Sequence, residues 1–440
     1  MPAAQEVALA GRDLVGRISS ARMQSDDLFR LVRDDALYDR PIPERNRIIF
    51  YIGHLEAFDW NLLHERVLGL KTFHPEFDRL FAFGIDPVGG GLPTDQPSEW
   101  PSLGQVREYV TRTRMQLDEN LATGVPCSSK SDDLSLLLNV AIEHRLMHVE
   151  TLAYMLHQLP IDRKIRHADP ANPDCSPITP AMVSIPAGQA TLGLPRDGQV
   201  FGWDNEFDAQ TVEVPTFEID RYKVTNQQYL EFMSAGGYDE PSLWRDDDWR
   251  WKIANGISHP SFWRYSNGQW RYRTMFDEVA LPMNWPVYVS YAEASAYARW
   301  AGKSLPSEAE WHRAAYGAPS GGERSYPWGN DAPDPSRGNF DFHRWNPVPV
   351  NAFPRGQSAF GVDGMLGNGW EWTSSTFAPF RGFQPFPFYP GYSAGFFDGK
   401  HFVMKGGSAR TAQCMLRPTF RNWFQAQYQY VYAGFRCVSR

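Results

Sequence analysis

The chain has 440 residues, a length that predicts two or three domains. Hydrophobic residues make up 42% and charged residues 21%, as in ordinary soluble proteins, and a net charge of −8 without a basic block argues against nucleic acid as a partner. No stretch reaches the ~18 apolar residues of a membrane span or has the apolar core of a signal peptide, and the four widely spaced cysteines form no disulfide framework, so we expect a cytoplasmic protein without a membrane partner.

Residues 1–165 are predicted to be helical. Apolar residues recur at spacings of three and four in four segments, 13–33, 46–70, 103–123 and 132–158. Glycine and proline lie mainly between these segments. Four amphipathic helices with one long connection favour a four-helix bundle.

The last helical segment contains the string AIEHRLMHVETL, with two histidines four residues apart. His144 and His148 share the apolar face of this helix, so both are predicted to point into the bundle. Two imidazoles at this spacing can bind one metal ion. Glu150 is two residues past His148, roughly 200° around the helix, and is not expected to join them as a ligand.

The second helical segment, RIIFYIGHLEAFDWNLL, offers a third ligand. His54 shares its face with aromatic and apolar neighbours, whereas His64 lies about 80° away around the helix and ranks lower. Three inward histidines on two helices favour a metal site over the alternative of buried, hydrogen-bonded imidazoles. By ligand type alone, three imidazoles suit Fe(II), Zn, Cu or Ni.

The rest of the chain differs in composition. Residues 166–182 are rich in proline and polar residues and are predicted to be a linker. Residues 183–440 are predicted to form an irregular α+β domain, with short β-like runs around 181–193 and 210–225 and clear helices around 225–235 and 290–301.

This second part contains specific strings, among them GWDNE, SLPSEAEWHRAA, GMLGNGWEWTSS, KGGS and AGFRCV. With them it resembles the formylglycine-generating-enzyme-type sulfatase-modifying domain, a relative of the C-type lectin fold. Formylglycine-generating enzymes act through a copper-binding cysteine pair just after the GGS motif. Here that segment, GGSARTAQCMLR, supplies only Cys414, so formylglycine formation is not expected.

The helical part resembles a DinB-like four-helix bundle. A DinB-like bundle followed by this second domain resembles the sulfoxide synthases of ergothioneine biosynthesis, non-haem iron enzymes that use O2 to join sulfur to the imidazole of hercynine (Nα-trimethylhistidine). Their iron ligands match Gly53-His54 and His144-x-x-x-His148-x-Glu150 here. The resemblance therefore implies Fe(II) bound by His54, His144 and His148.

The same resemblance implies residues for the substrate. An Asn-Trp pair that helps to hold hercynine matches Asn422 and Trp423, and an indole face suits a trimethylammonium group. A tyrosine that donates a proton or hydrogen atom is assigned to Tyr389, with Tyr392 as the second candidate. The alternative for both tyrosines is a packing role in a loop.

The sequence also departs from those synthases. Met147 stands where they often have glutamine, and the charged residues that bind γ-glutamylcysteine after the Asn-Trp pair are absent between Asn422 and Arg436. A substrate with two carboxylates is expected to be bound by arginine side chains, whose guanidinium groups form paired hydrogen bonds with a carboxylate. The segment has amides and phenols instead, which suit a neutral sugar; the residues assigned to this role are Gln425, Gln427 and Tyr428. The alternative is a strand in which alternate residues are buried.

The strings YDRPIPERNRIIFYIGHLEAFDWNLL and FAFGIDPVGGGLPTDQPSEWP resemble the selenoneine-synthase branch of this superfamily, which joins a selenosugar (1-seleno-β-D-glucose) to hercynine. The expected function is thus Fe(II)- and O2-dependent formation of a carbon–selenium bond to hercynine. The first alternative is a sulfoxide synthase that uses cysteine or γ-glutamylcysteine. The second is a sugar-binding protein without catalytic activity.

Overall fold

The computed structural model describes the chain except residues 1, 83–91, 123–130, 174, 176 and 199. It divides after His167 into two compact units, each of which is described by itself. In the described part of residues 166–181, which fall in the predicted linker, there is no helix or strand. Among the described residues, no helix has both the length and the apolar composition that a membrane crossing requires.

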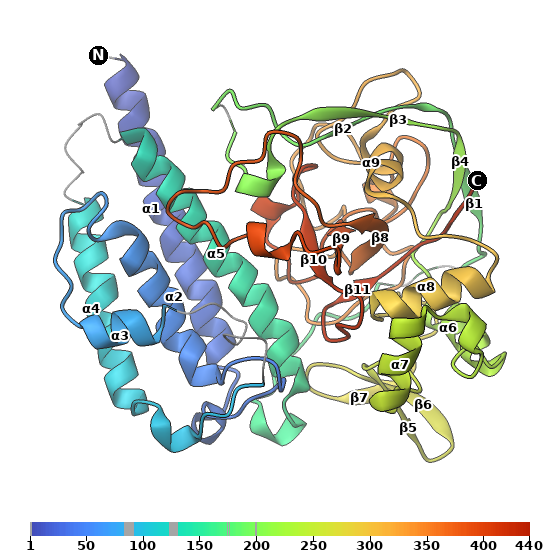
Figure 1. Ribbon diagram of the computed structural model, residues 1–440, viewed down its shortest axis with the longest axis horizontal. Helices are drawn as coiled ribbons and strands as arrows, with labels where there is room; N and C mark the ends of the chain where they lie inside the picture. Colours follow the sequence, from blue (N-terminus) through green and yellow to red (C-terminus); the bar gives the residue numbers. More distant parts are fainter. Residues whose placement is uncertain (1, 83–91, 123–130, 174, 176, 199) are drawn as a thin grey trace. The chain divides into compact units, whose positions relative to one another are not determined.

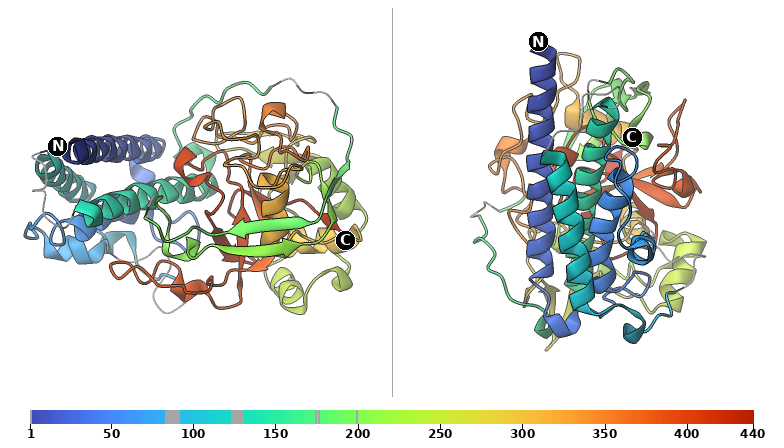
Figure 2. Two further views of the ribbon diagram at one scale, coloured as in Figure 1. Left: turned by 90° about the horizontal axis from the view of Figure 1, so that it is seen from above. Right: turned by 90° about the vertical axis from the view of Figure 1, so that its left-hand side faces the viewer.

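Four long helices make up most of the first unit (Figure 1). They are α1 (Pro2–Phe29), α2 (Ile48–Leu63), α4 (Leu103–Ala122) and α5 (Ser131–Gln158). Helix α1 packs along α5, and α2 packs against both α4 and α5 (Figure 2, right). The four helical segments predicted from periodicity are confirmed. The likeness of this unit to a DinB-like bundle stays a prediction.

Two details of the first unit differ from expectation. Helix α2 ends at Leu63 rather than near residue 70, because the chain turns there and the amide of Leu70 donates to the carbonyl of His64. The short helix α3 (Pro75–Leu80) was not predicted, since six residues carry no readable periodicity. Its N-cap is His74, whose ring nitrogen accepts from the amide of Phe77 at 3.3 Å.

The second unit mixes small sheets with short helices. Its largest sheet has the order β10 (Asn422–Gln425), β9 (His401–Lys405), β8 (Trp370–Thr376) and β11 (Ala433–Gly434). Another sheet joins β1 (Met182–Ile185), β4 (Phe217–Asp220) and β12 (Val438–Ser439). Strands β2 (Gly188–Leu192) and β3 (Gln210–Val214) form a two-stranded antiparallel sheet. A three-stranded antiparallel sheet has the order β5 (Trp263–Ser266), β6 (Gln269–Arg273) and β7 (Glu278–Ala280).

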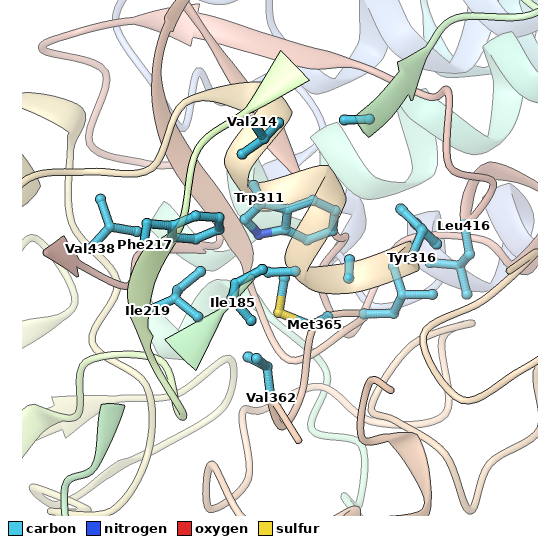
Figure 3. Packing of buried hydrophobic residues seen from close by; sticks show 14 of the residues in the cluster. Ile185, Val214, Phe217, Ile219, Trp311, Tyr316, Val362, Met365, Leu416 and Val438 are labelled. Carbon is cyan, nitrogen blue, oxygen red and sulfur yellow. The ribbon is translucent and has the colours of Figure 1, made fainter. Parts of the chain in front are cut away.

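Four helices accompany these sheets: α6 (Asn226–Ser234), α7 (Asp246–Ala254), α8 (Tyr291–Trp300) and α9 (Glu308–Tyr316). Helices α6 and α8 confirm the two predicted ones. Helix α9 was missed, although Ser307 and Glu310 form a capping box that the sequence displays. Its Trp311 is fully buried and packs with Ile185, Phe217 and Met365 in the core between α9 and the β1–β4–β12 sheet (Figure 3).

Candidate metal centre

Three histidines of the first unit converge on one point. The Nε2 atom of His148 lies 3.2 Å from Nε2 of His54 and 3.1 Å from Nε2 of His144. One ligand nitrogen from each ring lies within 4.8 Å of the other two, and in the described part of the chain this is the group of histidine, cysteine and carboxylate side chains close enough to bind one ion. Such an arrangement suits a single transition-metal ion with positions left open for other ligands.

The electrostatic environment keeps these rings neutral. Burial lowers the pKa of His54 to about 4; the Phe81 carbonyl raises it and the charge of Arg145 lowers it further. Burial and the neighbouring rings lower the pKa of His144 well below its usual value, and burial does the same for His148. A neutral imidazole has the free lone pair that a metal needs, so at pH 7 all three rings are ready to bind one.

The orientation of His54 is fixed from outside the group. Its Nδ1 donates to the backbone carbonyl of Phe81 at 2.7 Å, which leaves Nε2 unprotonated and turned toward the other two rings. This approach needs Gly53, because a Cβ atom there would lie only 2.5 Å from the Phe81 ring. The Gly-His pair is therefore one structural unit: the glycine admits the phenylalanine whose carbonyl orients the histidine.

Aromatic residues of α2 hold the rings further. Phe50 stacks on His54, with ring centroids 4.9 Å apart, and Phe58 stacks on His144 at 3.4 Å. Because both aromatic side chains come from the helix that carries His54, the packing of α2 against α5 sets the orientation of rings from both helices.

Other residues of these helices do not belong to the group. Glu150 is buried but is not among its members, as the helical phase predicted. His64 follows the end of α2, where its Nδ1 donates to the carbonyl of Trp60 at 2.8 Å. Met147 lies on α5 next to His148 and is half-buried.

The residues predicted for hercynine and for proton donation meet in the second unit. Trp423 lies parallel to Phe377 with centroids 4.0 Å apart, and the Tyr392 ring meets it edge-on at 5.5 Å. Tyr392 stacks on Trp203 at 3.9 Å and lies 5.6 Å from Tyr389. We call these five residues the aromatic cluster. It brings Trp423, Tyr389 and Tyr392 together, with one face of the Trp423 indole covered by Phe377.

Polar groups border this cluster. Burial, together with the nearby carboxylate of Asp204, raises the pKa of Tyr389 to about 12. Ser393 donates to Asp204 at 2.6 Å, which ties the loop that carries the two tyrosines to the string GWDNE. The side chain of Asn422 accepts from the amide of Trp423 at 2.8 Å, a contact within β10 itself.

The segment predicted to accept a sugar is built differently from expectation. Strand β10 ends at Gln425, whose carbonyl accepts from the amide of Tyr428 in a turn, so the run is strand only at its first residue. Burial does not alternate beyond it, because residues 427–430 are all half-buried. Gln425 and Gln427 line a cleft of about 580 Å³, and Gln427 donates to Asp248 at 2.5 Å. Tyr428 instead stacks on Phe424 at 4.7 Å.

This cleft is not neutral. The charged residues that line it are Arg245, Asp246, Asp247, Arg250 and Lys400. Four of the five come from α7 and its N-cap. Helix α7 was not predicted, because charges around its whole circumference hide the apolar periodicity. The segment after Trp423 thus carries no charge of its own, but the cleft that two of its residues line does.

Residues 168–440 match the sulfatase-modifying factor enzyme 1-like domain, which places the second unit in that class. The whole chain is 34% identical to the hercynine oxygenase of Mycolicibacterium smegmatis, over 97% of this chain and 99% of that protein. It is also 38% identical to the hercynine oxygenase of Mycobacterium tuberculosis, over 76% of this chain and 77% of the relative.

A third relative is longer. Ergothioneine biosynthesis protein 1 of Neurospora crassa is 28% identical over 93% of this chain, which corresponds to 55% of that protein. The chain belongs to the hercynine oxygenase family. In this chain a helical unit precedes the sulfatase-modifying factor domain.

Proposed function

We propose that this chain is an iron(II)- and O2-dependent enzyme that joins a chalcogen atom to the imidazole ring of hercynine. The observation that carries the proposal is the convergence of three buried, neutral imidazoles from α2 and α5. The names of the relatives supply hercynine as the substrate and ergothioneine biosynthesis as the setting.

His54, His144 and His148 would hold the iron. When bound, iron(II) supplies the activation of O2 and a charge that orients both substrates. For a thiol acceptor the atoms balance as follows: the imidazole C–H and the thiol S–H bonds break, and a C–S bond forms. One oxygen atom becomes the sulfoxide oxygen, and the other leaves as water with the two hydrogens.

The aromatic cluster is the proposed site for the trimethylammonium group and the proton donor. The indole face of Trp423 opposite Phe377 suits a quaternary cation by cation–π attraction. Tyr389 has its pKa raised to about 12, so its phenol stays protonated at neutral pH and can donate a proton or hydrogen atom. Asn422 and Tyr392 are proposed to support the same site.

Sulfur is the proposed chalcogen because relatives are named for hercynine oxygenation and ergothioneine biosynthesis. Cysteine or γ-glutamylcysteine is the proposed sulfur donor. One observation favours the selenosugar as a second candidate. The segment between Asn422 and Arg436 contains no charged residue, although it follows the proposed hercynine residues directly. An amide-rich, uncharged segment suits hydroxyl groups better than two carboxylates.

The test compares the candidate sulfur and selenium donors in parallel reactions. Purified protein loaded with Fe(II) is incubated in air with hercynine and either cysteine, γ-glutamylcysteine or 1-seleno-β-D-glucose, and mass spectrometry identifies the products. A thiol adduct establishes the sulfoxide synthase, and a selenium adduct alone establishes the second candidate. If the protein binds no iron and forms neither product, the result fits the sugar-binding alternative and contradicts the proposed enzymatic function.

A further inference from the structure

A buried charge network lies directly behind the histidine group. Arg145, the residue after His144, is 1% exposed. Its guanidinium donates to Glu56 at 2.9 Å, to Asp59 at 2.6 Å and to the backbone carbonyl of Leu55 at 3.0 Å. All three acceptors belong to α2 and follow His54 within five residues. The network therefore joins α5, at the residue after His144, to α2 at positions one to five residues after His54.

Glu56 is also a junction for the rest of the unit. Arg114 of α4 donates to it at 2.6 Å, and Arg22 of α1 lies 3.9 Å away. Four helices thus meet at one buried carboxylate, with Arg145 as the member contributed by α5.

We propose that Arg145 is a positioning residue for the metal: its guanidinium fixes α2 against α5 in the one register that brings His54 to His144 and His148. The inference rests on the proposed metal function. Three directional bonds from a planar guanidinium to side chains and to a backbone carbonyl fix both the sliding and the rotation of one helix against the other.

The helical rise per residue and the tolerance of metal–ligand distances show why this register needs a specific directional contact. Sliding an α-helix by one residue moves its side chains by about 1.5 Å along the axis. Metal–ligand distances tolerate only about 0.2 Å. The apolar packing between α2 and α5 is less directional than this tolerance requires, because apolar contacts of similar size adapt to small shifts.

Stability alone is a weak explanation of the same network. Removing two charges from water costs much of what their attraction returns, and a buried ion pair often contributes little net stability compared with apolar residues of similar size. A network placed immediately behind the histidines, and bonded to the carbonyl that follows His54, instead specifies geometry at that point.

The chain offers a matched control in Arg114. Its guanidinium bonds the same Glu56 and also Asp26 of α1, at 2.7 Å and 2.8 Å. Within the described part of the chain its hydrogen bonds go to these side chains of α1 and α2, and not to α5 or to the Leu55 carbonyl. Arg114→Met therefore removes a comparable ion pair from the same carboxylate without removing the α2–α5 link.

The experiment measures metal binding rather than turnover. The double variant Arg145→Met/Asp59→Asn removes one charge of each sign, so Glu56 keeps Arg114 as its partner. Co(II) affinity is measured by titration, its absorption spectrum reports the coordination geometry, and thermal unfolding without metal reports stability. Arg145→Lys is the second variant. It keeps the positive charge and disturbs the packing less, but lysine lacks the planar guanidinium that bonds several acceptors at once.

We expect both Arg145 variants to bind Co(II) about 10- to 100-fold more weakly, with an altered spectrum, the range typical of residues that orient metal ligands. Arg114→Met should unfold at a lower temperature yet keep the wild-type affinity and spectrum. Wild-type Co(II) binding in both Arg145 variants would overturn the inference and leave the proposed function standing. A wild-type protein that binds no metal overturns both.

Discussion

The histidine group of the first unit and the aromatic cluster of the second are each stabilised in a different way. The histidine group depends on two long helices, on one carbonyl from Phe81 and on a buried arginine. The aromatic cluster gathers side chains from strands and loops that lie up to about half the chain apart, and rings packed on rings fix it. Metal binding should therefore depend on the first region alone, whereas turnover should depend on both.

The largest expected effect is the loss of metal from His144→Ala. Removing one of three ligands should weaken Fe(II) or Co(II) binding by more than about 100-fold, because orienting groups alone account for 10- to 100-fold. Metal content after gel filtration measures this directly. His64→Ala is the control, since His64 bonds the Trp60 carbonyl at the end of α2. Equal metal loss in both variants would remove the distinction between the two histidines.

Tyr389→Phe should separate the two regions most sharply. Metal binding should stay at the wild-type level, and turnover should fall by roughly 10²- to 10⁴-fold, as for the loss of a general acid. Because the pKa of Tyr389 is raised to about 12, its phenol stays protonated well above neutral pH, so wild-type turnover should show no alkaline decline from this group between pH 7 and 10. Tyr265→Phe, which alters an exposed tyrosine of β5 with no assigned role, serves as the control. Unchanged turnover in Tyr389→Phe would leave the tyrosine with a packing role.

Gly53→Ala tests the unit formed by the glycine, Phe81 and His54. The added Cβ would displace the Phe81 ring and with it the carbonyl that orients His54, so metal affinity should fall about 10- to 100-fold. Gly104→Ala is matched, since nothing lies within 4 Å of a Cβ at that position. It should keep its metal and gain up to about 1 kcal/mol of stability, because alanine favours a helix over glycine. Metal binding that survives in Gly53→Ala would show that the Phe81 carbonyl is dispensable.

The two regions also differ in how far the sequence predicted them. The period of an α-helix relates positions four residues apart, so the inward phase of His54, His144 and His148 could be predicted before any coordinates. Charged residues such as Glu56 and Arg145 among the apolar residues of these helices are a signal of a buried network that the sequence displays. The Phe81 contact left no trace, because a backbone carbonyl supplies it from 27 residues away.

In the second unit, local patterns indicated elements but not their contacts. A resemblance in the strings around Trp423 and Tyr389 predicted roles for Trp423, Tyr389 and Tyr392, and these roles stay predictions. That the three lie together, packed with Trp203 and Phe377, is visible only in the fold. The charged cleft beside Gln425 and Gln427 depends on α7, which lies more than 170 positions earlier in the chain. Long-range packing of loops has no short period, so no reading of the nearby residues reveals it.

Trp423→Leu has the smallest expected effect and tests whether the aromatic cluster recognises a cation. Phe377 covers one indole face and the Phe396 ring lies 5.7 Å from the indole, so a trimethylammonium group can use only the part of the ring that these two leave. Cation–π attraction contributes about 0.5–2 kcal/mol, which corresponds to a roughly 2- to 30-fold loss of hercynine affinity. Binding of histidine, which lacks the three methyl groups, should change less, because its ammonium is better hydrated. The ratio of the two affinities, measured by calorimetry in metal-loaded protein, is therefore the informative quantity. An equal loss for both ligands would mean that Trp423 only supports the packing of Phe377 and Tyr392, and the trimethylammonium group would then have to be recognised elsewhere.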